Sequence, residues 1–204
     1  MTALALAAGG GLDGRRIAIL MESDYYEPEI FYYERRFAEE GARVDLVSRL
    51  WGQPSLQFTG HEFRAPIAVT HDLGELEGDG LLAYDALVVP SGMVSDRLRY
   101  TEDVTATPPA TRLLARAVAE SGLVVGIVCH GLWLAAPLPD IVRGRSVTCH
   151  NNLVGDARNM GARYVDADVV LDGDLLTGRA GPVAHLFARE LVHLLRQRPE
   201  GGVR

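Results

Sequence analysis

A cysteine followed by a histidine, at the end of a long apolar run, is the part of this sequence best suited to chemistry. Residues 121–136 read SGLVVGIVCHGLWLAA. The run over 123–128 is typical of a strand buried on both faces of a parallel sheet, and residues 132–136 have a helical composition. A nucleophile between such a strand and a helix forms a nucleophile elbow, a tight turn that holds the side chain in strained backbone space. We therefore predict that Cys129 is a reactive nucleophile.

The glycines of this stretch fit the same interpretation. Gly126 and Gly131 would let the strand and the helix approach each other closely. The thiol of Cys129 would lie at a helix N-terminus, where the dipole and the free N–H groups favour the thiolate. The structural alternative is that Cys129 is a small core residue, as free cysteines usually are.

A cysteine nucleophile also needs a base, an oxyanion site and a group that steadies the base. Candidates follow the predicted strands, whose ends meet at one rim of a parallel sheet. They are Glu27 and Glu29, the Gly92 amide and Asp96, His130 and its own amide, and His150. Each has a structural alternative: Glu29 suits the first turn of a helix, Asp96 suits an N-cap, and His150 suits a turn. We expect His61, His71, His185 and His193 to be surface or packing residues.

Composition narrows the choice of function. The 204 residues carry a net charge of −7, which argues against nucleic-acid and anionic-membrane partners. Two cysteines give no disulfide framework, and no apolar run approaches the ~20 residues of a membrane span, so we expect a cytoplasmic protein. No spacing matches a zinc site, an EF-hand or a phosphate-binding loop, and we predict neither a metal nor a cofactor.

The elements that must position these residues alternate between strand and helix. We predict strands at 16–21, 43–48, 85–90, 123–128 and 146–148, a strand pair at 169–177, and helices at 25–40, 108–120, 154–160 and 183–196. Residues 50–81 are irregular, with a small hairpin arm at 61–64. This order predicts an α/β fold with a doubly wound, mostly parallel, flavodoxin-like sheet flanked by helices. We expect a flexible leader over 1–14 and a single domain over 15–204.

With those residues in view, the chain resembles the ThiJ/PfpI superfamily, which includes the Parkinsonism-associated deglycase and has a fold like class I glutamine amidotransferases. The resemblance spans about 16–195 and is closest to the PfpI-type intracellular protease branch. Its motifs are GIVCHG, the Glu-Pro-Glu segment before the first helix, YDALVVPSG, and RGRSVTCH followed by NMGARYVDADVVLDGDLLTGR.

The resemblance implies a role for each candidate. Cys129 matches the nucleophile, and Glu29 matches the acid that contacts the thiol, with Glu27 as a second choice. His130 matches the histidine of the PfpI branch, whose carboxylate partner comes from a neighbouring subunit at the position of Asp96. The amides of Gly92 and His130 match the oxyanion site. A homodimer or a higher homo-oligomer is therefore expected.

The chain also departs from the family pattern. Asp96 stands where the PfpI branch has a glutamate, and Ser91 replaces the first glycine of its PGG turn. His150 falls where the deglycase branch carries a histidine near the cysteine. Aromatic neighbours would rim the pocket and suit a small organic substrate; they are Tyr25, Tyr26, Tyr32, Tyr33 and Trp133.

The leading hypothesis is a cofactor-independent cysteine enzyme acting on a small carbonyl electrophile, by glyoxalase III-like hydration or deglycase-type hydrolysis. Three alternatives remain: a PfpI-type cysteine peptidase or amidase, a pathway-specific hydrolase or hydratase of a secondary metabolite, and a non-enzymatic redox sensor or chaperone in which Cys129 is oxidised.

Overall fold

The computed structural model describes residues 11–198 and has one main sheet. Its strands are β1 (Arg16–Leu20), β2 (Arg43–Ser48), β5 (His71–Asp72), β6 (Ala86–Val89), β7 (Val124–Val128), β10 (Val169–Asp172) and β11 (Leu175–Gly178). Within the described residues these seven strands lie in the order β10-β11-β7-β6-β1-β2-β5. Neighbours run parallel, except that β10 is antiparallel to β11. The predicted doubly wound, mostly parallel sheet is confirmed.

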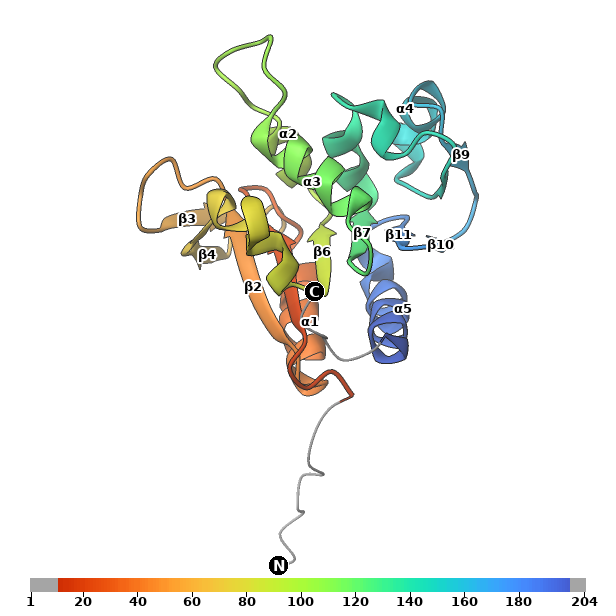
Figure 1. Cartoon of the computed structure of the whole chain (residues 1–204). Coiled ribbons are helices and arrows are strands. Elements are labelled where there is room, and N and C mark those ends of the chain that lie inside the picture. The colour runs from red at the N-terminus through yellow and green to blue at the C-terminus, as the bar shows by residue number, and fades with distance from the viewer. Residues whose placement is uncertain (1–10, 199–204) are drawn as a thin grey trace, which may run out of the picture.

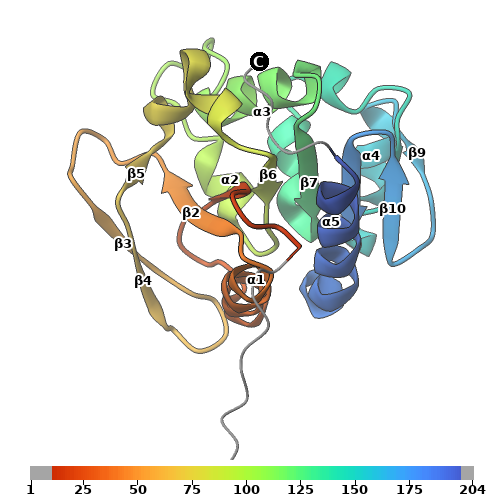
Figure 2. The same ribbon diagram turned by 60° about the horizontal axis from the view of Figure 1, so that its bottom comes forward.

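Helices cover both faces of this sheet. The long ones are α1 (Glu27–Glu39), α3 (Pro109–Ala119) and α5 (Ala184–Gln197). Figures 1 and 2 show α1 and α5 side by side on one face, with α3 on the other. The α1–α5 contact is aromatic, because the ring of Tyr33 lies 5.4 Å from Phe37 and 5.7 Å from Phe187. Helix α1 ends at Gly41, whose φ of +90° is the left-handed conformation of a helix-terminating glycine.

Shorter elements lie at the edges of the sheet. The remaining strands and α-helices are β3 (Leu56–Thr59), β4 (Pro66–Val69), β8 (Ser146–Val147), β9 (Arg163–Tyr164), α2 (Val94–Leu98) and α4 (Val154–Asn159). The 3-10 helices are η1 (Leu73–Leu76), η2 (Gly78–Ala83), η3 (Cys129–Ala135), η4 (Pro139–Ile141), η5 (Asn151–Leu153) and η6 (Gly181–Val183). Strands β3 and β4 form the predicted hairpin arm. Strand β8 pairs with β9 outside the main sheet, so the strand predicted at 146–148 is present but not part of that sheet.

Glycines allow the close packing around β7. A Cβ on Gly126 would lie 2.6 Å from the Phe187 ring, so α5 could not sit this close to the strand with any other residue there. A Cβ on Gly131 would lie 2.8 Å from the carbonyl oxygen of Val89 in β6. Both glycines therefore have the close-packing role expected of them, and they fix where β7 ends relative to its neighbours.

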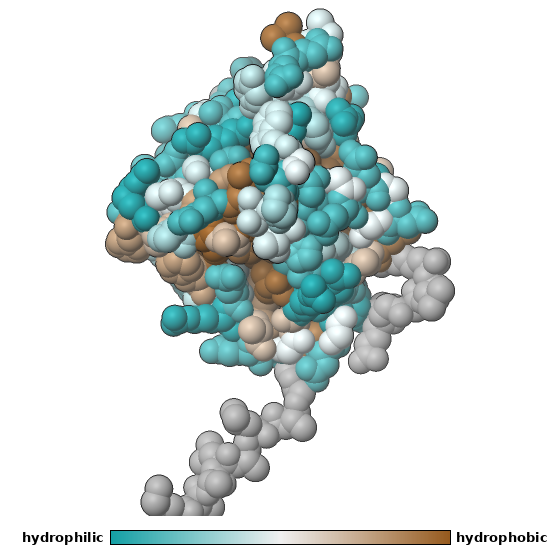
Figure 3. Space-filling model, turned by 90° about the vertical axis from the view of Figure 1, so that its left-hand side faces the viewer, coloured by the Kyte–Doolittle hydropathy of each residue, from teal (hydrophilic) through white to brown (hydrophobic). Residues whose placement is uncertain are grey.

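The segment before β1 packs against the domain where it is described. Leu12 is 1% exposed, and its N–H donates to the carbonyl of Glu40 at 2.9 Å. The rest of the predicted leader, residues 1–10, lies outside the described residues, as do residues 199–204 of the predicted domain. The face in Figure 3 is mostly hydrophilic, with interspersed hydrophobic areas. Among residues 11–198, no helix has both the length and the apolar character needed to cross a membrane.

Candidate active site

Cys129 stands at the turn where β7 becomes η3. Its φ of +59° is a left-handed conformation that a non-glycine residue adopts only under strain, as expected for a nucleophile elbow. The following helix is a 3-10 helix over Cys129–Ala135, tighter than the helix predicted from composition. The elbow thus places Cys129 at the carboxyl end of β7, a strand inside the main sheet.

The sulfur of Cys129 is enclosed by backbone donors. N–H groups of His130, Gly181 and Gly92 bond to it and lower its pKa. Burial has the larger, opposite effect and, together with the nearby charge of Glu29, raises the pKa of the thiol to about 11. We expected the helix N-terminus to favour the thiolate of Cys129. The local N–H donors do favour it, but desolvation outweighs them, so the protonated thiol is favoured.

Glu29 comes from the first turn of α1 and is fully buried. Its Oε2 accepts the N–H of Ser91 at 2.9 Å and also the Ser91 hydroxyl. Burial raises the pKa of this carboxyl to about 7, while the two donors from Ser91 and the buried hydroxyl of Tyr33 oppose the rise.

The charge of Glu29 acts on Cys129, since it contributes to the raised pKa of the thiol. The pKa of Glu29 is raised only to about 7 and that of Cys129 to about 11, so the carboxyl loses its proton before the thiol does. An ionised carboxyl near a protonated thiol is a candidate acceptor for the thiol proton.

Two imidazoles stand on the other side of the sulfur. His130 Nδ1 lies 3.2 Å from Sγ of Cys129, and the His130 ring centroid is 4.6 Å from that of His150. Burial and the neighbouring His150 both lower the pKa of His130, so its neutral form is favoured. The backbone carbonyl of His130 accepts the Ser95 hydroxyl at 2.6 Å, which fixes the turn.

These groups open onto a cleft of about 510 Å³. It is lined by Tyr26, His61, Glu62, Ser91, Gly92, Met93, Cys129, His130, His150, Ala180, Gly181 and Pro182. Gly92 has a φ of +83°, and a Cβ there would lie 2.3 Å from the carbonyl oxygen of Asp24, so only glycine fits. The sequence-predicted residues that meet at the cleft are Cys129, His130, Gly92, His150 and Tyr26, with Glu29 buried beneath them.

Besides Glu29, six predicted residues do not line the cleft. Two of them are Tyr32 and Tyr33 on α1, where Tyr33 is fully buried against Phe187 of α5. Tyr25 does not line the cleft: its ring is fully buried, and its hydroxyl donates to the carbonyl of Ala65 at 2.6 Å. Glu27 is also fully buried and holds the backbone of the β3–β4 loop. Trp133 lies behind His130, with ring centroids 5.0 Å apart. Asp96 points to solvent on α2 and pairs with Arg99 at 3.0 Å, away from His130 of its own chain.

Sequence reasoning missed six residues that line the cleft: His61, Glu62, Met93, Ala180, Gly181 and Pro182. Gly181 follows β11, the strand next to β7, and a Cβ on it would lie 2.2 Å from the Tyr26 ring. The Gly-Pro pair after a strand was the available signal. His61 is a surface residue as expected, with 62% of its side chain exposed, but it also lines the cleft beside Glu62. Their place depends on how the hairpin arm folds back. Within residues 11–198, no three His, Cys, Asp or Glu side chains are grouped to hold a metal ion.

Known proteins with this arrangement are related to the chain over most of its length. A family model described as the DJ-1/PfpI family matches residues 15–194. A deglycase of Pyrococcus horikoshii is 29% identical, over 89% of this chain and 99% of the relative. Protein/nucleic acid deglycase 2 of Escherichia coli is 28% identical, over 89% and 98%. YraA of Bacillus subtilis, named as a candidate cysteine protease, is 25% identical, over 89% and 99%.

Solved structures agree on the fold. The crystal structure of a ThiJ/PfpI domain protein from Brachyspira murdochii superposes with a TM-score of 0.76 at 17% identity, over 92% of this chain and 99% of that one. The mostly parallel α/β sheet flanked by helices is the fold that this chain shares with that ThiJ/PfpI domain protein. The chain belongs to the DJ-1/PfpI family.

Proposed function

We propose that the protein is a cofactor-independent cysteine enzyme that converts small carbonyl compounds, by hydrating a 2-oxoaldehyde to a 2-hydroxy acid or by hydrolysing a related carbonyl adduct. One observation supports this most strongly. Cys129 lies in a cleft with three N–H donors on its sulfur and near a buried carboxyl, Glu29, whose charge acts on the thiol and which can accept its proton. Relatives named as deglycases are consistent with it.

The first step is addition of the thiol to the aldehyde. The sulfur of Cys129 bonds to the carbonyl carbon, the π electrons move onto oxygen, and the thiol proton passes to Glu29. The N–H groups of Gly92 and His130, already directed at the sulfur, stabilise the oxyanion that forms beside it. Gly181 supplies a third donor.

The later steps need only proton transfers and water. The C1 hydrogen moves as a proton to C2, so the adjacent ketone becomes an alcohol and a thioester is left on Cys129. Water then breaks the carbon–sulfur bond, and the thiol regains a proton. The sum adds one water without net oxidation. Glu29 and His130 are the groups placed to carry these protons, since His130 Nδ1 lies 3.2 Å from the sulfur.

The test is turnover by the purified protein. Incubation with methylglyoxal should yield lactate, and Cys129→Ala should give none above the uncatalysed rate. Glu39→Gln is the control, because it changes an exposed side chain at the C-terminal end of α1 that does not line the cleft. Equal yields from the wild type and Cys129→Ala would contradict the proposal.

A cysteine peptidase or amidase is the second candidate, favoured by the contact between His130 Nδ1 and the sulfur. In this reaction His130 would take the thiol proton, and Asp96 of a second copy would orient the imidazole. The solvent-facing place of Asp96 is compatible with that role. This candidate predicts cleavage of fluorogenic peptides by a homo-oligomer and its loss in Asp96→Asn. A fully active monomer would contradict it.

A further inference from the structure

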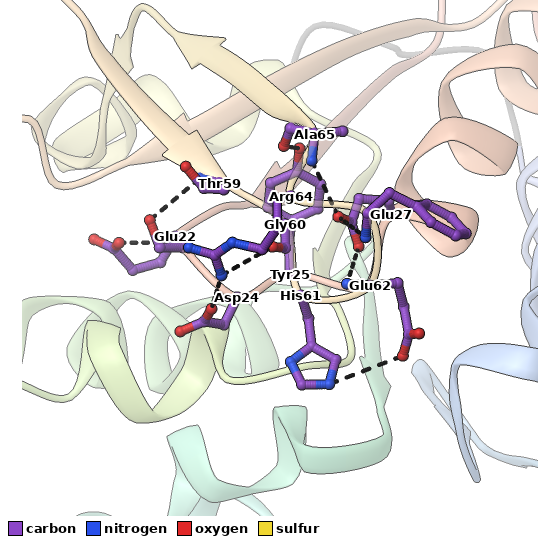
Figure 4. Close-up of polar contacts among 12 residues, drawn as sticks. Glu22, Asp24, Tyr25, Glu27, Thr59, Gly60, His61, Glu62, Arg64 and Ala65 are labelled. Carbon is purple, nitrogen blue, oxygen red and sulfur yellow. Dashed lines mark hydrogen bonds and ion pairs between the residues drawn. The ribbon is translucent and has the colours of Figure 1, made fainter.

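The loop 60–65 between β3 and β4 is fastened to the segment that joins β1 to α1 (Figure 4). The buried carboxylate of Glu27 accepts backbone N–H groups of Glu62 at 2.8 Å, Phe63 at 2.9 Å and Ala65 at 3.3 Å. Burial alone would raise the pKa of Glu27, but these donors outweigh it and lower the pKa, so the anchor is charged. A charged acceptor with three backbone donors is a strong tether.

Further bonds close the loop from the other side. The N–H of His61 donates to the carbonyl of Tyr25 at 2.9 Å. Arg64, at a φ of +55°, donates to Asp24 at 3.3 Å and to the carbonyl of Gly60 at 3.4 Å. The loop is therefore a preformed wall of the cleft, and its two lining residues, His61 and Glu62, are held in place through their backbone.

Glu62 is the one carboxylate among the described residues that line the cleft, and no arginine or lysine is among them. Its side chain is 45% exposed, and the Nε2 atom of His61 lies 3.8 Å from its carboxylate. Arg64 of the same loop does not line the cleft and pairs with Asp24 at 3.3 Å. Above about pH 7 the buried carboxyl of Glu29 adds a second negative charge beneath the cleft. The charge that a ligand meets in the cleft is therefore negative.

We propose that Glu62 is a specificity-determining residue that makes the cleft select neutral or cationic electrophiles and disfavour anionic ones. The substrate class is thus carbonyl compounds that are uncharged or bear an ammonium or guanidinium group, rather than 2-oxo carboxylates. That the electrophile is a carbonyl compound rests on the proposed function. The charge preference rests only on the geometry of the cleft wall.

The test measures access to Cys129 without requiring turnover. Three methanethiosulfonate reagents of similar size, one neutral, one cationic and one anionic, are reacted with the protein near pH 8 at low salt. Rates are divided by those of a free thiol, and Cys129→Ala reports any background from Cys149, which is fully buried. The wild type should react faster with the cationic than with the anionic reagent. In Glu62→Gln that ratio should fall on the order of fivefold, and Glu62→Lys should reverse it.

The matched control is Glu39→Gln. It removes the same charge from an exposed site at the far end of α1, about 18 Å along the helix from Glu27. Its ratio should equal that of the wild type. An unchanged ratio in Glu62→Gln, or an equal fall in Glu39→Gln, would overturn the proposal, the latter because the net charge of −7 would then be responsible. The probe forms a mixed disulfide with Cys129 and releases methanesulfinate, so it needs no turnover. A failure to form lactate would therefore overturn the proposed function and leave this result standing.

Discussion

Replacing Ser91 by alanine should raise the pH at which Glu29 ionises. In the structure the carboxylate accepts two donors from Ser91, the N–H at 2.9 Å and the hydroxyl. Both stabilise the charged form against burial, which raises the pKa of Glu29 to about 7. The alanine variant keeps the N–H and loses the hydroxyl, so the protonated form becomes more favourable.

The size of the effect follows from the type of bond. A hydrogen bond to a charged group contributes about 1.5–3 kcal/mol, and 1.36 kcal/mol corresponds to one pH unit. The inflection should therefore move upward by about one to two pH units. If Glu29 accepts the thiol proton, the acid limb of the activity profile moves with it, and activity near pH 7 falls about five- to fiftyfold while the plateau at high pH is kept.

The assay has a readout that does not depend on catalysis. Infrared difference spectra of wild type minus Glu29→Gln isolate the carboxyl stretch of this residue, and its loss on titration gives the inflection directly. Ser95→Ala is the control, because its hydroxyl donates to the neutral carbonyl of His130 and not to Glu29. An inflection in Ser91→Ala that coincides with the wild type would refute the reasoning.

Three further predictions concern stability. The folded chain holds the proton of Glu29 more tightly than the unfolded chain does. The contribution of this proton to the free energy of unfolding is therefore full below the unfolded pKa of 4.5 and declines as the pH rises through about 7. Glu29→Gln should lack this decline, so its free energy of unfolding in urea should gain about 2–3 kcal/mol on that of the wild type between pH 5 and pH 8. Cys129 adopts a φ of +59°, so Cys129→Gly should be more stable than Cys129→Ala by about 1 kcal/mol by the same method. Gly131→Ala would put a Cβ 2.8 Å from the Val89 oxygen and should lower stability by about 1–3 kcal/mol and the melting temperature with it.

Each of these has a result that would count against it. A wild type and Glu29→Gln with parallel stability profiles would mean that the carboxyl is hydrated. Equal stability of the two Cys129 variants would mean that the elbow relaxes once the thiol is gone. A Gly131→Ala variant as stable as the wild type would mean that η3 can move away from β6.

The fold was predictable because its signals are local. Uninterrupted apolar runs such as 123–128 mark strands buried on both faces, and a glycine such as Gly41 marks a helix end. The type of helix that follows Cys129 was not predicted correctly, and this too has a physical cause. The 3-10 form of η3 depends on how closely Gly131 lets the turn approach β6, a tertiary contact that composition does not encode.

The candidate site was predictable where a residue directly follows a strand. Cys129 and Gly92 follow β7 and β6, which are neighbours in the sheet, and Glu29 lies in the first turn of α1, the helix after β1. The expected low pKa of the thiol was not met, because the degree of burial depends on packing around the whole rim. His61 reaches the cleft only because Glu27, predicted as a site-lining residue, tethers the loop that carries it.

Whether Glu29 accepts the proton of Cys129 is tested most directly by the pH dependence of Cys129 alkylation by iodoacetamide, measured in the wild type and in Glu29→Gln. The account predicts a wild-type rate that rises through an inflection near the pKa of about 7 that burial gives Glu29, since the carboxylate then accepts the thiol proton. Glu29→Gln should lose this inflection and react slowly until the thiol itself ionises. An inflection that is identical in both proteins would show that Cys129 is activated without Glu29 and would contradict the account.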